Sequence, residues 1–113
     1  MENILNILDS RDNRKIQLKL AEIADRMVGD VYSYSDVILM LAEINQVDLR
    51  KFDYEVREQV LYLVCEIVEN YRINDVNILE NIFNQKNYIE SDLQEYIDEI
   101  YFCITTKPPH RQA

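Results

Sequence analysis

The sequence contains a single glycine, Gly29, and only two prolines, Pro108 and Pro109. Domains rich in strands need frequent turns, and turns draw on glycine and proline. Their scarcity therefore favours helices joined by breaks of Asn, Asp and Ser. With one glycine there is also no phosphate-cradling loop, no dinucleotide-binding fingerprint and no EF-hand loop, because each of these motifs requires glycine at fixed positions.

Histidine and cysteine are scarce as well, which narrows the possible chemistry. The only histidine is His110, so no Ser-His-Asp or Cys-His pair is expected on a rigid element. Cys65 and Cys103 lie far apart in apolar stretches, without the spacing of a metal site. We expect both to be reduced, buried thiols. The sequence thus predicts no catalytic, cofactor-binding or metal-binding residues and a protein that is not an enzyme.

Long apolar runs are missing too. The longest ones, at 37–42 and 60–65, are too short to span a bilayer. The first residues begin with an acid and lack the apolar core and cleavage site of a signal peptide. Together with two unpaired cysteines, these features predict a cytoplasmic protein that does not contact membranes.

Acids outnumber bases by 21 to 12, giving a formal net charge of −9. Residues 1–28 carry five acids and five bases, so the whole excess lies after them. The electrostatic field of such a negative charge repels phosphate backbones and anionic lipids and attracts basic partners. We therefore expect a basic protein as the partner, and no nucleic acid. A purely solubilising surface is the alternative interpretation of this charge.

Apolar residues recur at helical spacing along most of the chain, which predicts an all-α fold. Asp12 and Asp53 are expected to cap two of the helices, and Gly29 is expected to end one in a left-handed conformation. We predict one helical domain over residues 1–106 and a disordered tail over 107–113. Six helices are expected, at about 2–9, 13–28, 34–45, 54–72, 75–84 and 92–104.

The fourth predicted helix carries a recognisable pattern. Asp53-Tyr-Glu-Val56-Arg57, followed by Val60 and Val64, resembles the start of the second helix in a HEAT-type repeat, which reads D-x-x-V-R. The resemblance implies three antiparallel helical pairs. The segment at 13–17 departs from the pattern and the repeat-specific proline is missing, so a compact irregular bundle fits the same helices.

Two surfaces combine acids with tyrosines and are candidates for partner binding. One is the connector 30–36, and the other is the polar side of the fourth helix, which the sixth helix extends if the pairs are HEAT-like. Tyrosine offers rigid contact area and a hydroxyl, and neighbouring carboxylates can meet Lys or Arg. The candidate partner-binding residues are Asp30, Tyr32, Tyr34, Asp36, Glu55, Gln59, Tyr62, Glu66, Glu69, Asp92, Glu95 and Glu99.

The acidic, tyrosine-containing stretches at 30–36 and 90–101 are similar in character to small acidic bacterial toxin-immunity proteins. That resemblance implies a protein-binding inhibitor that neutralises a cognate basic, nuclease-type toxin domain, as a monomer or in a 1:1 heterodimer. One alternative is a HEAT-like scaffold or adaptor for a peptide or a larger assembly. Another is an enzyme or metal-binding regulator built on the acids of 92–99.

Overall fold

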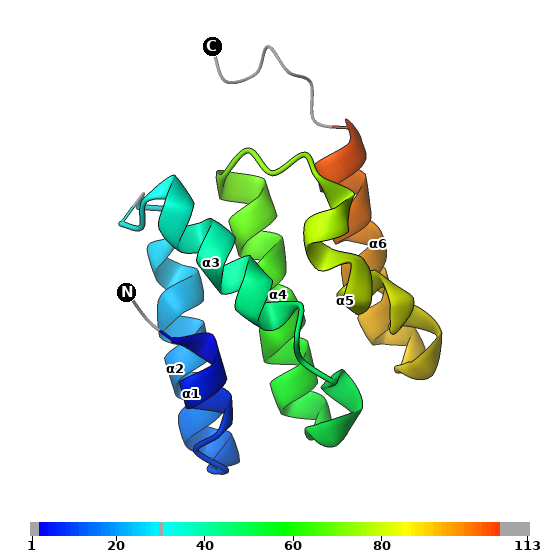
Figure 1. Ribbon diagram of the computed structural model, residues 1–113. Coiled ribbons are helices and arrows are strands. Elements are labelled where there is room, and N and C mark those ends of the chain that lie inside the picture. The colour runs from blue at the N-terminus through cyan, green and yellow to red at the C-terminus, as the bar shows by residue number, and fades with distance from the viewer. Residues whose placement is uncertain (1–2, 30, 107–113) are drawn as a thin grey trace.

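The computed structural model describes residues 3–29 and 31–106 of the chain. These residues form six α-helices, joined by short turns and 3-10 helices, and contain no strand (Figure 1). The predicted all-α fold is confirmed, whereas the predicted tail at 107–113 lies outside the described residues. The α-helices are α1 Ile4–Leu8, α2 Asn13–Arg26, α3 Tyr34–Ile44, α4 Tyr54–Asn70, α5 Glu80–Asn84 and α6 Ser91–Thr106. The 3-10 helices are η1 Leu49–Lys51, η2 Val76–Leu79 and η3 Lys86–Tyr88.

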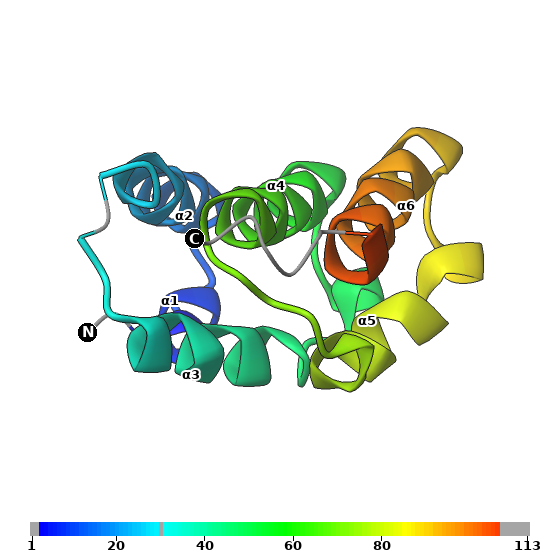
Figure 2. The same cartoon turned by 90° about the horizontal axis from the view of Figure 1, so that it is seen from above.

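The helices lie in two layers. Figure 2 shows α2, α4 and α6 side by side in one layer and α1, α3 and α5 in the other. In Figure 1, α2, α4 and α6 run in one direction, and α1, α3 and α5 run in the opposite direction. Each consecutive pair is therefore antiparallel, as predicted. The molecule is flat, with extents of 41 × 31 × 19 Å, because only two layers of helices are stacked.

Helix α4 forms the centre of the fold. It packs between α2 and α6 within its own layer and also contacts α3 in the other layer. Leu63 and Ile67 share one side of its axis and Leu61 points away from that side, yet all three are fully buried. A helix that is apolar around most of its circumference needs cover on more than one side. The three neighbours of α4 supply that cover.

The two predicted aspartate caps are confirmed only in part. The Asp12 carboxylate accepts a hydrogen bond from the Lys15 N–H at 3.1 Å and caps α2 as predicted. Asp53 occupies the capping position of α4, but its carboxylate instead accepts a hydrogen bond from the Asn13 side chain. That bond ties the first turn of α4 to the first turn of α2.

The prediction of a left-handed Gly29 is wrong. Helix α2 ends at Arg26, and the turn that follows keeps Gly29 at a negative φ. The positive φ lies at Arg11, at 62°, in the tight turn between α1 and α2. A glycine marks where a left-handed residue would cost little, but the geometry of the turn decides where one is needed.

The predicted fifth helix is shorter and less regular than expected. It begins as η2, capped by Asp75, whose carboxylate accepts the Asn77 N–H at 3.0 Å, and becomes α-helical only at Glu80. The last helix is longer than predicted, beginning at Ser91 and reaching Thr106. None of the helices in the described part of the chain has the length and apolar character needed to cross a membrane.

Side-chain amides join α5 to the turn after α3. The Gln85 side chain is 8% exposed; its oxygen accepts the Leu49 N–H and its nitrogen donates to the Val47 carbonyl, each at 2.8 Å. The Asn45 side-chain oxygen accepts the Asn81 N–H at 2.9 Å, and the Asn81 amide donates to the Asn45 carbonyl at 2.8 Å. We call Asn45, Asn81 and Gln85 the amide clamp. It satisfies backbone groups that the short helices leave without partners.

Candidate partner-binding groove

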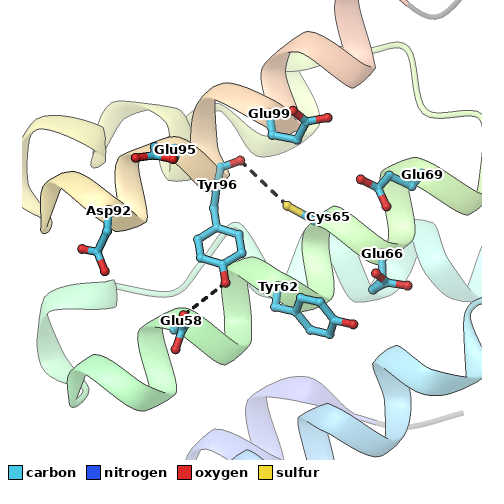
Figure 3. A pocket seen from close by; sticks show the side chains of 9 residues that line it. All are labelled: Glu58, Tyr62, Cys65, Glu66, Glu69, Asp92, Glu95, Tyr96 and Glu99. Carbon is cyan, nitrogen blue, oxygen red and sulfur yellow. Dashed lines mark hydrogen bonds between the residues drawn. The ribbon is translucent and has the colours of Figure 1, made fainter.

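An open groove of about 520 Å³ runs between α4 and α6 on the outer face of their layer (Figure 3). The two helices run in the same direction, so their first turns lie at one end of the groove and their last turns at the other. We call these the Asp92 end and the Glu99 end. The lining residues are Glu58, Tyr62, Cys65, Glu66 and Glu69 from α4 and Asp92, Glu95, Tyr96 and Glu99 from α6.

The groove is strongly acidic. Six of its nine lining side chains are carboxylates, the other three are two tyrosines and a cysteine, and none of the nine is basic. The C-terminal ends of α4 and α6 both lie at the Glu99 end, where the helix dipoles add partial negative charge. A concave surface lined by one sign of charge concentrates the field and attracts cations.

The floor of the groove is uncharged. Cys65 is 8% exposed, and its thiol donates to the Tyr96 backbone carbonyl at 3.9 Å (Figure 3). Burial raises the pKa of the Cys65 thiol to about 12, and the negative charges of neighbouring carboxylates add to the effect. The thiol therefore stays protonated at neutral pH, and the negative charge is confined to the rims.

Two tyrosine hydroxyls bridge the helices at the Asp92 end. Tyr54 of α4 donates to the Asp92 carboxylate of α6, and Tyr96 of α6 donates to the Glu58 carboxylate of α4 at 3.1 Å. The bond to Asp92 raises the pKa of Tyr54 to about 12. The pKa of Tyr96 is raised first by burial and then by Glu58. We call these two hydrogen bonds the tyrosine bridges.

An ion pair adds a further link beyond that end. The Arg57 guanidinium donates to both carboxylate oxygens of Glu90, with an Nε–Oε1 distance of 3.3 Å, and also to the Phe52 carbonyl. The pKa of Glu90 is lowered first by a hydrogen bond from the backbone N–H of Glu90 and then by the Arg57 guanidinium. Arg57 belongs to the D-x-x-V-R pattern, and here it fixes the chain just before α6 against α4.

Carboxylates of the two helices also approach each other at the Glu99 end. One oxygen each from Glu69 and Glu99 and the Cys103 sulfur lie within 4.8 Å of one another. Cys103 donates to Glu99 at 3.6 Å. Two carboxylate oxygens and a sulfur at this spacing form a cluster of electronegative atoms at this end of the groove.

The structure brings half of the sequence-predicted site residues together in this groove. Glu55 and Gln59 lie next to it on α4, with Glu55 exposed in the first turn and Gln59 half-buried. Tyr62 is 37% exposed, and the Glu66 carboxylate beside it raises its pKa. The predicted residues that line the groove are Tyr62, Glu66, Glu69, Asp92, Glu95 and Glu99.

The connector residues are not part of the groove. Asp30 lies outside the described residues. Tyr32 is 8% exposed, its carbonyl accepts the Tyr71 hydroxyl at 2.8 Å, and its ring belongs to the core rather than to a contact surface. Tyr34 is exposed and Asp36 half-buried at the start of α3, which lies in the other layer.

Sequence reasoning missed Glu58, Cys65 and Tyr96. The missing signal was a pair of matched spacings: Tyr54 precedes Glu58 by one helical turn, and Asp92 precedes Tyr96 by one turn. When two parallel helices lie side by side, each tyrosine can reach the carboxylate of the other helix. Recognising this requires knowing that α4 and α6 are parallel neighbours, which only the HEAT-like interpretation of the sequence implies.

Comparisons of this chain with protein-family models, with curated proteins and with solved structures gave no match. The groove must therefore be interpreted from its own residues.

Proposed function

We propose that this protein is a protein-binding inhibitor that uses the groove between α4 and α6 to hold a basic partner. The observation that carries the proposal is the lining of the groove, with six carboxylates and no base among nine residues. Such a surface favours Lys and Arg side chains and disfavours phosphates. The proposal makes binding, rather than catalysis, the task of these residues.

The exposure of the carboxylates indicates what kind of binding to expect. Glu69, Glu95 and Glu99 are all exposed to solvent, where charge pairs add little affinity but speed up and orient encounters. Tight binding needs uncharged contacts as well, which the Tyr62 ring can supply beside the acids. We expect fast association that weakens steeply as salt increases.

The class of partner that fits these features best is a nuclease-type toxin domain. Proteins that bind nucleic acid are commonly basic, and an acidic protein can block such a surface directly. The proposed role is that of a bacterial immunity protein, acting in the cytoplasm as a monomer that forms a 1:1 complex. The resemblance of residues 30–36 and 90–101 to that class supports the same role.

Co-expression with the product of the neighbouring gene tests this proposal. The expected result is a stoichiometric complex with a basic protein whose toxicity is suppressed. Replacing Glu66 and Glu69 by lysine should lower the association rate about tenfold or more at low salt. A matched control with the same change in charge replaces Glu22 and Glu80, which are exposed and outside the groove. A neighbour that does not bind, or equal effects of both double variants, would contradict the proposal.

A second candidate function is a HEAT-like scaffold or adaptor. The observation in its favour is the side-by-side arrangement of three antiparallel pairs in two layers (Figure 2). An adaptor of this kind should bind its target mainly through apolar contacts. Its complex should therefore persist at high salt and tolerate the substitutions at Glu66 and Glu69, which distinguishes it from the inhibitor.

A further inference from the structure

The residues that follow α6 are basic, in contrast to the groove. After Thr106 the sequence reads Lys-Pro-Pro-His-Arg-Gln-Ala, with Lys107 and Arg111 and no acid. The other base after Arg72 is Lys86, which pairs with Asp98 at 2.6 Å. Lys107 and Arg111 therefore form a separate group of positive charge in an otherwise acidic part of the chain.

This basic segment starts beside the acidic end of the groove. Helix α6 carries Glu99 and Cys103 and ends at Thr106, and Lys107 is the next residue in the sequence, four after Cys103. Oxygens of Glu69 and Glu99 lie within 4.8 Å of the Cys103 sulfur and of each other. Lys107 thus follows the C-terminal end of a helix, where the dipole also favours a cation.

The segment is long enough to reach back to the Glu99 end of the groove. Thr106 lies seven helical residues beyond Glu99, or roughly 10 Å along α6. From Thr106 to Arg111 an extended chain spans up to about 17 Å. Arg111 therefore has the reach to meet carboxylates at the Glu99 end of the groove, while Lys107 stays closer to the end of α6.

We propose that residues 107–113 are an intramolecular ligand of the groove, with Lys107 and Arg111 facing Glu66, Glu69 and Glu99. A short connection gives such a ligand an effective concentration in the millimolar range, enough for a contact that forms and opens readily. The segment competes with any external cation for the same carboxylates. The inference that this segment regulates partner binding rests on the proposed function. The contact between the segment and the groove does not depend on that function.

Amide chemical shifts in the full-length chain test the contact directly. Replacing both Lys107 and Arg111 by glutamine should shift the amides of Glu66 and Glu69, which lie on α4, far from the substitutions in sequence. The matched control replaces Lys15 and Lys19 of α2, both exposed, by glutamine and changes the net charge equally. Shifts at Glu66 and Glu69 in the first variant but not in the control support the proposal. Unchanged shifts at both residues overturn it.

Binding of octa-arginine tests the competition. The variant lacking Lys107 and Arg111 should bind this peptide about three- to tenfold more tightly than the unmodified chain at low salt, because the internal competitor is gone. The gain should disappear at high salt, and the α2 control should show less of it. Equal gains in both variants would mean that net charge alone is responsible and would overturn the competition. If octa-arginine binds none of the three proteins, the groove fails as a cation-binding surface, while the amide shifts still decide the intramolecular contact.

Discussion

The third helical pair is attached to the rest of the fold by two junctions of different chemistry. In one layer, α5 meets the turn after α3 through the amide clamp, whose groups are neutral and include the buried Gln85. In the other layer, α6 meets α4 through the tyrosine bridges and the Arg57–Glu90 ion pair, whose carboxylates are largely exposed. One junction is closed by uncharged hydrogen bonds, and the other is left open as a groove.

The difference indicates how stability and binding are divided between the layers. A buried amide with both ends bonded contributes to folding regardless of pH and salt, because it has no charge to titrate or screen. Exposed carboxylates contribute little to folding, but they keep negative charge accessible to a partner. The amide clamp can hold the third pair in place while the α4–α6 junction stays free to bind.

The largest expected effect concerns the floor of the open junction. Because burial raises the pKa of Cys65 to about 12 from 9.0, its thiolate should be about a thousandfold rarer in the folded than in the unfolded chain below pH 9. Alkylation of Cys65 should be slowed accordingly, with urea-unfolded protein as the reference. Rapid labelling of Cys65 under native conditions would show that α6 separates from α4 readily, and the two junctions would then differ in rigidity too.

The next largest effect should come from the closed junction. Replacing Gln85 by alanine leaves the Leu49 N–H buried without a partner and the Val47 carbonyl with only the long 3.5 Å contact from the Asn81 amide, which should cost about 2–3 kcal/mol of unfolding free energy. Urea denaturation measures this loss. Gln46→Ala is a matched control, because Gln46 is exposed and its side-chain hydrogen bond to the Ala42 carbonyl is long at 3.5 Å. A loss for Gln85 no larger than for Gln46 would remove the distinction between the junctions.

Removing a tyrosine bridge should have a smaller effect. Tyr96→Phe keeps the ring but takes away the hydroxyl that donates to Glu58, and water can replace it at this partly exposed site. We expect a loss of about 0.5–1 kcal/mol in the same urea experiment. Tyr101→Phe is the control, since Tyr101 is exposed and packs through its ring, edge-on against Phe83. A loss as large as that for Gln85→Ala would mean that the open junction is also essential for folding.

The smallest effect should be the pH dependence that comes from Tyr54 and Glu90 at the open junction. The pKa of Tyr54 is raised from 10.0 to about 12, so its contribution is complete below pH 10 and is lost as the pH rises toward 12. The pKa of Glu90 is lowered from 4.5, so its contribution is complete above that value and is lost as the pH falls through the folded-state pKa. Stability measured against pH should decline at both ends. Tyr54→Phe should flatten the alkaline decline only, and an unchanged alkaline decline would rule out the Asp92 bond as its cause.

Much of the fold follows from the sequence because periodicity reports directly on burial. The stripe around Val60, Leu63 and Ile67 predicted a central helix, and all three side chains are fully buried. The ends of the elements were less predictable. Gly29 suggested a left-handed turn, but the turn that requires one contains Arg11. Helix ends depend on contacts such as that between Asn13 and Asp53, which join residues remote in sequence.

The sequence predicted the outward-facing acids of the candidate site, but it did not predict the residue that forms the floor. Glu66 and Glu99 were found because charge on the polar face of a helix is visible from the sequence. Cys65 was expected in the core, and it is buried, but its place beneath the groove depends on which helix lies next to α4. Tyr32 was assigned to a surface because it lies between acids, yet neighbours elsewhere in the chain bury its ring. Local composition does not reveal such neighbours.

The tyrosine bridges also affect the entropy of binding. An exposed glutamate normally loses rotational freedom when a partner fixes it, at about 0.5–1.5 kcal/mol for each immobilised side chain. Glu58 and Asp92 are already held by hydroxyls from the opposite helix, so folding has fixed their rotamers in advance. A cation that enters the Asp92 end meets acceptors that are held from the opposite helix, whereas Glu99 accepts its hydrogen bond from Cys103 of its own helix. The two ends of the groove therefore differ in how their carboxylates are held.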